Sequence, residues 1–421
     1  MKQPLGFVNT DFPLHVCKLN KSIYSLKQAP RAWFAKLSDG LLTLGFRCSS
    51  ADSSLFIFRI GSDCIYLLIY VDDILVTGSS SLLISQFIAS LSKYFPVKDL
   101  GLLHYFLGIE VHRTSSGLFL SQTKYITDLL KRTNMHNCKA VSTPMSSSEK
   151  LTVLDGCTYE DPQWYRSVVG SLQYLAFTRL DISFAVNRVC QFMHNPRLPH
   201  WSAVKRILRY LNNTRQLGLS FSSSSSIKLT AFSDADWAGC PDDRRSTGGF
   251  CIYLGNHLIS WGSKKQPTIA RSSTEAEYKS VANTTFEILW LQSLLKELGV
   301  GLSDPPTLWC DNIGATYLSM NLVLHSRTKH VELDYHFIRE RVAAKALHVA
   351  FVSSKDQVAD IFTKPLSTTR FTLLRSSLTL AQVPLESRGD NKVNILSSEK
   401  HEHSRALESG SAESHCNKEN K

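Results

Sequence analysis

The sequence lacks the marks of several protein classes. It contains ten cysteines, but no C-x-x-C pair and no Cys/His spacing typical of a zinc site. No apolar stretch is long enough to span a bilayer, and no basic segment followed by an apolar run stands at the N-terminus. Cys64, Cys190, Cys251 and Cys310 lie in apolar runs, as small buried hydrophobic residues do. We therefore expect an intracellular protein of the cytoplasm or nucleus, with no membrane partner.

Composition indicates a chain that folds and carries excess positive charge. The 421 residues are 43% hydrophobic, which is ample for real cores, and the length predicts roughly two or three domains. The formal net charge is +11 and the isoelectric point is about 9.1. That excess favours a polyanionic partner, nucleic acid above all, although a merely basic surface would give the same numbers.

Patterns along the chain divide it into four segments. Residues 1–145 begin with mixed helix and strand signals, including an expected helix at 30–44, a hairpin at 64–77 and a helix at 81–93. Strands at 105–112 and 117–121 and a helix at 122–133 complete that segment. Residues 146–222 start in a linker rich in serine and threonine and continue as a helical connection, which a serine run ends.

The third segment, residues 227–366, opens with strands and then alternates strands with helices, one of them long and near 274–298. That order predicts a mixed sheet, and an α+β fold class for the chain. The tail, residues 383–421, is rich in Ser, Glu, Lys, Asn and His with few large apolar residues, so we expect disorder there.

One apolar hairpin carries two adjacent carboxylates, in Tyr70-Val71-Asp72-Asp73. Such a pair at a bend could hold metal ions on an incoming triphosphate, since carboxylate oxygens are the ligands that Mg²⁺ prefers. Asp-Asp is also ordinary turn chemistry, and taken alone the tetrapeptide favours that interpretation.

Other segments place this turn in a context. Tyr-Val-Asp-Asp resembles the catalytic turn of reverse transcriptases, and four longer stretches resemble copia-type LTR retrotransposon Pol polyproteins in the expected order. These are LNKSIYSLKQAPRAWF (19–34), KDLGLLHYFLGIEV (98–111), QYLAFTRLDISFAVNRVCQFMHNPRLPHWSAVKRILRYL (173–211) and ADIFTKPL (359–366). The resemblance covers nearly everything from Met1 to about Leu380. It implies a partial reverse-transcriptase palm and thumb, a connection and an RNase H-like mixed-sheet domain.

The resemblance also implies that part of the polymerase is missing. In that family the segment that MKQPLGFV resembles follows shortly after the first catalytic Asp of the palm, and this sequence begins inside it. We therefore expect an N-terminally truncated chain without fingers, in which Asp72 and Asp73 lack their main metal-binding partner. DNA polymerase activity is expected to be lost or very weak.

The third segment offers a second set of carboxylates. An RNase H-like domain uses acidic residues from the first strand, the first helix, a middle strand and the last helix, and their metals activate water and stabilise the leaving oxygen. The resemblance assigns these places, in that order, to Asp234, Glu277, Asp311 and Asp360. Two Mg²⁺ ions, or Mn²⁺, are the implied cofactor.

Each acidic residue also has a plainer interpretation. Asp236 shares a strand face with Asp234, so spacing does not separate the two. Glu277 could serve in a capping box that starts at Thr274, and Glu275 is its rival. Asp311 could cap a helix, and Asp360 could lie on a solvated helical face. Four such residues in family order favour the catalytic interpretation.

The predicted function is cleavage of RNA in RNA–DNA hybrids, with template RNA and cDNA as partners and other parts of the transposon polyprotein as further ones. A virus-like particle is the ancestral setting that the resemblance implies. The side chains we expect at phosphates, which could equally form a solubilising surface, are Lys27, Gln28, Arg31, Arg271, Lys329 and His330. The alternative is a non-catalytic nucleic-acid-binding relic of a transposon, which a chain without cooperative unfolding would favour.

Overall fold

The computed structural model describes residues 2–19, 26–115, 117–148, 150–223, 226–321, 332–383 and 393–398. The chain forms two compact units, of which the first comprises Met1–Leu103 with Lys392–Lys421 and the second His104–Asn391. The sequence predicted a boundary near residue 145. The units divide at Leu103 instead, because β8 (Gly117–Ser121) pairs with β9 (Leu217–Ser222) and ties the segments on either side of residue 145 together.

In the described residues of the first unit, a six-stranded sheet packs with two helices. Its helices are α1 (Ala29–Thr43), which buries Leu37 and Leu41, and α2 (Ser81–Tyr94), which buries Leu91. In sheet order the strands are β1 (Arg47–Cys48), β2 (Leu55–Ile60), β3 (Asp63–Tyr70), β4 (Asp73–Gly78), β16 (Val393–Ser398) and β5 (Val97–Leu102). The predicted helices at 30–44 and 81–93 and the predicted hairpin at 64–77 are therefore confirmed.

Strand β16 is supplied by the far end of the chain. It lies between β4 and β5 and runs antiparallel to both, with Leu396 opposite Ile74 on one side and Asp99 on the other. The predicted disorder of residues 383–421 is therefore wrong for Val393–Ser398. Composition did not reveal this strand, because the unpaired backbone edges that it satisfies belong to segments far away in the sequence. Residues 384–392 and 399–421 of that predicted tail lie outside the described residues.

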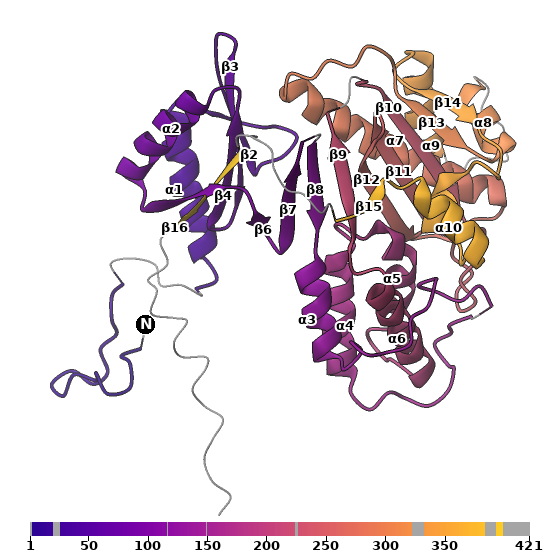
Figure 1. The fold of residues 1–421 in the computed structure, drawn as a ribbon, viewed down its shortest axis with the longest axis horizontal. Helices are drawn as coiled ribbons and strands as arrows, with labels where there is room; N and C mark the ends of the chain where they lie inside the picture. The colour runs from indigo at the N-terminus through magenta and orange to yellow at the C-terminus, as the bar shows by residue number, and fades with distance from the viewer. Residues whose placement is uncertain are drawn as a thin grey trace, which may run out of the picture. The chain divides into compact units, whose positions relative to one another are not determined.

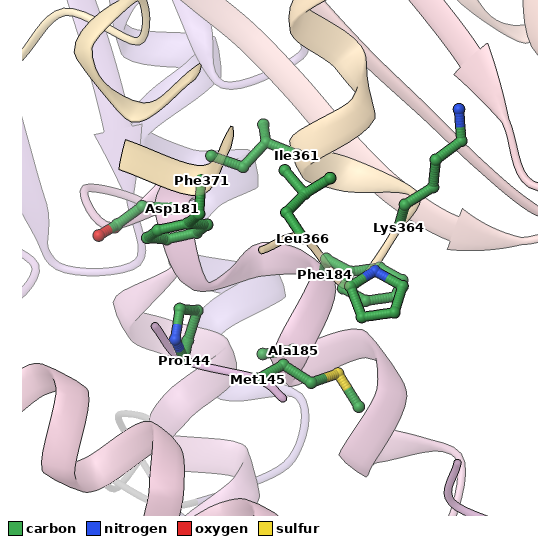
Figure 2. A pocket seen from close by; sticks show the side chains of 10 residues that line it. Pro144, Met145, Asp181, Phe184, Ala185, Ile361, Lys364, Leu366 and Phe371 are labelled. Atoms are coloured by element: carbon green, nitrogen blue, oxygen red, sulfur yellow. The ribbon is translucent and has the colours of Figure 1, made fainter. Parts of the chain in front are cut away.

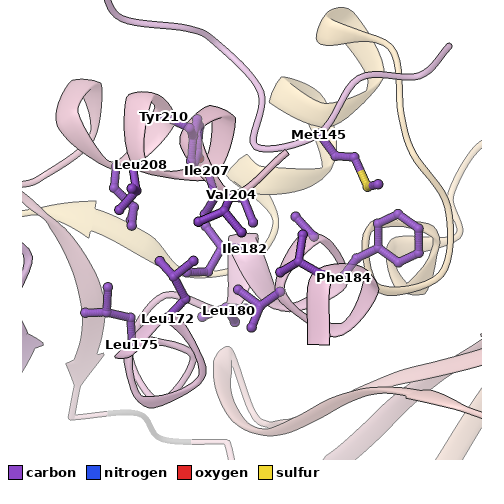
Figure 3. Close-up of a cluster of buried hydrophobic side chains, with 14 of the residues drawn as sticks. Met145, Leu172, Leu175, Leu180, Ile182, Phe184, Val204, Ile207, Leu208 and Tyr210 are labelled. Atoms are coloured by element: carbon purple, nitrogen blue, oxygen red, sulfur yellow. The ribbon is translucent and has the colours of Figure 1, made fainter. Parts of the chain in front are cut away.

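An antiparallel sheet and a layer of helices form the first part of the second unit. The sheet has the order β15 (Leu380–Gln382), β9, β8, β7 (Ile109–Thr114) and β6 (Tyr105–Phe106). Beside it lie α3 (Thr123–Arg132), α4 (Pro162–Leu175), η1 (Leu180–Ile182), α5 (Ser183–Cys190) and α6 (Leu198–Asn213). Figure 3 shows how Leu172, Ile182 and Val204 from three of these elements meet in one apolar cluster.

A mixed sheet forms the rest of the second unit (Figure 1). Its order is β12 (His257–Lys265), β11 (Thr247–Leu254), β10 (Leu229–Ala235), β13 (Thr307–Cys310) and β14 (His348–Phe351). The first three strands are antiparallel, whereas β10, β13 and β14 are parallel. The other elements that the described residues form here are α7 (Ser273–Glu297), α8 (Ile313–Met320), α9 (Glu332–Ala343), η3 (Val358–Phe362) and α10 (Thr368–Ser376). This confirms the α+β prediction.

Alternating side chains connect this sheet to two cores. In β11, Ile252 packs into the core formed with α7, α8 and α9, whereas Cys251 and Tyr253 pack into the core shared with α4, α5 and α6. Both faces of the sheet are thus covered, which leaves the ends of its strands as the place for functional side chains. No helix among the described residues is both long and apolar enough to cross a bilayer.

Candidate active site

Three aspartates from separate elements meet at the carboxyl end of the two central strands. Asp234 lies in β10, Asp311 follows β13 directly, and Asp360 lies in η3. Because β10 and β13 are parallel neighbours, with Ser233 opposite Cys310, the register places the first two aspartates side by side. One carboxylate oxygen from each aspartate lies within 4.8 Å of the other two. We call these three residues the aspartate cluster.

One short segment supplies most of the partners of this cluster. Lys364 Nζ lies 3.0 Å from Asp234 Oδ1 and 2.8 Å from Asp360 Oδ1. The Thr363 hydroxyl donates a hydrogen bond to the other oxygen of Asp234, and Arg370 donates to the other oxygen of Asp360 at 3.1 Å. Two fixed donors thus orient the carboxylates, and the ammonium group bridges the oxygens that face one another.

Burial makes the cluster a site for cations. Asp234 is fully buried and Asp360 nearly so, while Asp311 is half-buried and accepts a hydrogen bond from the Ser354 hydroxyl at 2.9 Å. Burial raises the pKa of Asp234, and the charges of Asp360 and Asp311 raise it further against the opposing effect of Lys364. Like charges this close are unfavourable without a compensating cation. The ammonium between them shows that the site accommodates one, and an all-carboxylate donor set fits Mg²⁺ or Mn²⁺.

Glu277 reaches the same end of the strands from the first turns of α7. It is 6% exposed, and its Oε2 lies 3.8 Å from the sulfur of Cys310, the residue before Asp311. Burial, and then the charges of Asp234 and Asp311, raise the pKa of Glu277 to about 10. The residue stands beside the aspartate cluster without belonging to the group of oxygens that lie within 4.8 Å of one another.

The two rival carboxylates have other partners. Asp236 accepts a hydrogen bond from the backbone N–H of Thr247, just past the end of the β10–β11 pair, and burial raises its pKa to about 6. Glu275 accepts from Lys279 Nζ at 2.7 Å and from the backbone N–H of Arg271 at 2.8 Å. The N-terminal cap of α7 is Ser272, whose hydroxyl accepts a hydrogen bond from the backbone N–H of Glu275. The sequence had suggested a capping box that starts at Thr274 instead.

The acidic turn of the first unit is a tight hairpin. Tyr70 pairs with Asp73, which leaves Val71 and Asp72 as the two loop residues. Val71 has φ of 55°, a left-handed conformation that β-branched residues rarely adopt. The Trp33 indole of α1 donates a hydrogen bond to the Val71 carbonyl at 2.9 Å and so fixes the turn against that helix. Strain held in place this way is frequent at functional sites.

The predicted phosphate contacts belong to both units. Lys27, Gln28 and Arg31 are exposed around the first turn of α1, in the first unit. Arg271 is exposed just before α7, in the second unit. Lys329 and His330 lie outside the described residues.

Sequence reasoning missed the residues that hold the aspartate cluster. Lys364 follows Asp360 by four positions, a spacing that signals an ion pair on a helical turn, and this signal was available in the sequence. The contacts of Thr363 and Lys364 with Asp234 span 129 and 130 positions and have no local signal.

A small pocket of the second unit touches the site only through the stem of a lysine. Figure 2 shows Lys364 extending away from the apolar side chains of this pocket. Asp181, its other charged lining residue, is ion-paired with buried Arg179 at 2.8 Å. The remaining lining residues are Pro144, Met145, Phe184, Ala185, Ile361, Pro365, Leu366 and Phe371. Among the described residues, the carboxylates that could hold a metal ion together are those of the aspartate cluster, whereas the carboxylate in this pocket is already ion-paired.

Comparison with known proteins shows the family. The profile of the reverse transcriptase (RNA-dependent DNA polymerase) family matches residues 1–147. The chain is 55% identical over 384 residues to the retrovirus-related Pol polyprotein from transposon RE1 of Arabidopsis thaliana, over 91% of this chain and 26% of that polyprotein. It is 36% identical to a putative transposon Ty5-1 protein of Saccharomyces cerevisiae, over 68% of this chain and 94% of that protein. The chain belongs to the copia-type retrotransposon Pol family.

This chain matches only part of the length of the transposon polyproteins. The chain spans about a quarter (26%) of the RE1 polyprotein, and 29% of the related polyprotein from transposon TNT 1-94 of Nicotiana tabacum, to which it is 40% identical over 89% of its own length. Among solved structures, RNase H1 LC11 from compost is 13% identical with a TM-score of 0.26, over 32% of this chain and 93% of that one. The foamy viral protease-reverse transcriptase with dsDNA is 13% identical with a TM-score of 0.39, over 79% of this chain and 60% of that one. The family assignment rests on the transposon relatives.

Proposed function

We propose that the second unit hydrolyses the RNA strand of RNA–DNA hybrids with two divalent metal ions, Mg²⁺ or Mn²⁺. The observation that supports this is the convergence of Asp234, Asp311 and Asp360, from three separate elements, to within 4.8 Å at a buried strand end. Membership in the retrotransposon Pol family supports the substrate, since that setting joins template RNA to cDNA. The same setting favours the cytoplasm, within a virus-like particle, or the nucleus.

Four side chains would hold the metal ions: Asp234, Asp311 and Asp360, with Glu277 beside them. When bound, such ions supply activation of the attacking water and neutralisation of charge on the leaving oxygen. The chain's own contribution is orientation. Thr363 and Arg370 each fix one oxygen of a carboxylate and leave the other for the cation. Ser354 donates to one oxygen of Asp311 at 2.9 Å and Gln357 donates to the other at 3.5 Å, so both oxygens of this carboxylate are oriented. The buried surroundings of Asp234 keep competing water away.

The exposed cationic side chains would contact the hybrid through its phosphates. Lys27 and Arg31 on the first unit and Arg271 on the second present charge to solvent, and the whole chain has a formal charge of +11. Such contacts read the shape and backbone of a hybrid and not its sequence. Binding should therefore weaken as salt concentration rises.

We propose further that this chain has little DNA polymerase activity on its own. Polymerisation by two metals needs several carboxylates at one point. Among the described residues, the group of three carboxylates that meets this requirement is Asp234, Asp311 and Asp360, in the second unit. Primer extension by the purified chain would contradict this proposal.

The test of the nuclease is cleavage of an end-labelled RNA–DNA hybrid in Mg²⁺. We expect the wild type to cut the RNA strand and Asp311→Asn to lose about a hundredfold or more, the scale of losing one electrostatic stabiliser in an active site. Asp304→Asn is the matched control, because Asp304 is exposed in the loop before β13 and should leave cleavage unchanged.

The outcome separates two functions. Cleavage that disappears in Asp311→Asn but persists in Asp304→Asn supports the nuclease. Binding of the hybrid without cleavage, by a wild type that unfolds cooperatively, would instead support the alternative of a non-catalytic nucleic-acid-binding relic.

A further inference from the structure

Lys364 lies where the carboxylates of the cluster face one another. Its Nζ contacts Oδ1 of both Asp234 and Asp360, at 3.0 and 2.8 Å. The second oxygen of each carboxylate already has a partner, in Thr363 and Arg370. The ammonium therefore occupies the oxygens that remain for a metal ion.

The position of Lys364 also allows its side chain to leave the aspartate cluster. Its side chain is 37% exposed, whereas those of Asp234 and Asp360 are 0% and 11% exposed. An ammonium on a four-carbon stem moves without disturbing its backbone, and it is strongly hydrated once in water. The carboxylates are held by Thr363 and Arg370, so departure of the lysine would not require them to reorient.

A divalent ion and this ammonium cannot share these oxygens. Mg²⁺ binds carboxylate oxygens at about 2.0–2.1 Å, so an ion on the two Oδ1 atoms would lie within about 4 Å of Nζ, where the two cations repel strongly. Binding of the ion to these atoms and binding of Lys364 are thus competing events.

We propose that Lys364 is a built-in counter-ion, which holds the aspartate cluster together before metal binds and is displaced when it does. It is a positioning residue that sets the metal concentration at which the site loads. The inference rests on the proposed metal-binding role of the cluster, but not on which nucleic acid is cut.

The first test uses the unaltered full-length chain. An amine-reactive anhydride followed by mass spectrometry measures the labelling rate of each lysine with and without Mg²⁺. We expect labelling of Lys364 to rise severalfold when Mg²⁺ is added, because metal releases its amine to solvent. Lys355, which is exposed and lies outside the cluster, is the internal control and should not change. Equal labelling of Lys364 in both conditions would overturn the proposal.

The second test measures metal affinity directly. Titration calorimetry with Mn²⁺, without nucleic acid, compares the wild type, Lys364→Met and Lys355→Met. We expect Lys364→Met to bind Mn²⁺ about tenfold more tightly or better, since no charge-assisted contact has to be displaced. Lys355→Met should match the wild type. Equal affinity in all three chains, or no Mn²⁺ binding by any of them, would overturn the proposal.

These results are distinguishable from failure of the nuclease. Metal-dependent exposure of Lys364 in a chain that cuts no hybrid would support the counter-ion and contradict the proposed function. Cleavage that depends on Asp311, in a chain whose Lys364 is labelled equally with and without metal, would support the proposed function and contradict the counter-ion. If Lys364→Met does not fold, the labelling experiment on the wild type still decides.

Discussion

Two aspartates that lie two positions apart in β10 and just after it, Asp234 and Asp236, have different partners. Asp234 and Asp236 share a strand face, so their spacing could not separate them, and only resemblance to a family favoured Asp234. The structure separates them because the β10–β11 pair ends at Ala235 and Gly248. Past that end the chain turns, and Asp236 bonds the backbone of Thr247 instead of facing the cluster. Where a strand stops is decided by its neighbour, which sequence spacing does not contain.

Glu277 and Glu275 should respond oppositely to the same substitution. Glu277→Gln should abolish hybrid cleavage yet leave the metal-free chain as stable or more so, because burial already favours the neutral carboxyl. Glu275→Gln should keep cleavage and lose about 1 kcal/mol, since it weakens the partly buried pair with Lys279. Urea unfolding and the cleavage assay check both. Loss of cleavage in Glu275→Gln with retention in Glu277→Gln would reverse the assignment.

Among the elements, amphipathic helices were the easiest to predict. The helix expected at 122–133 is α3, Thr123–Arg132, because its apolar residues recur at helical spacing. The same logic misses elements whose partners are distant. Arg179 and Asp181 would be placed on a surface by charge alone. They are fully buried because they pair with each other and because Arg179 also donates to the carbonyl of Thr214, 35 positions away.

The first turn of helix α6 contains a histidine, His200, whose protonation should affect the stability of the fold. His200 is buried; its Nδ1 accepts from the Arg197 backbone N–H at 3.0 Å, and its Nε2–H donates to the Thr152 carbonyl at 2.9 Å. These bonds need a neutral ring, and burial lowers the pKa of His200 below its ordinary 6.5. The folded chain thus binds fewer protons than the unfolded one, so stability is lost as pH falls below about 6.5.

The measurement is thermal unfolding between neutral and mildly acidic pH. We expect the wild type to lose stability on acidification and His200→Gln to lose less, since glutamine does not titrate. His194→Gln is the control, because His194 is exposed and lies on the same stretch of chain. An unchanged pH slope in His200→Gln would contradict the assignment.

At the scale of the whole molecule, the tail returns to the first unit. Ending the chain at Val383 removes β16 and should expose the edges of β4 and β5. We expect faster hydrogen exchange in the backbone amides of Asp73–Gly78 and Val97–Leu102, with β10 of the second unit unchanged. Ending the chain at Ser398 keeps β16 and serves as the control. Equal exchange in both truncations would show that β16 contributes nothing to that sheet.

The place of β16 also has a consequence for biosynthesis. A ribosome makes β4 and β5 early, but their shared neighbour emerges roughly 290 residues later, which takes roughly 15 to 60 s at ordinary elongation rates. During that interval two strand edges of the nascent chain lack this partner, and such edges recruit other chains. The first unit should therefore depend on chaperones during translation far more than the second, whose mixed sheet closes with β14, well before the tail is made.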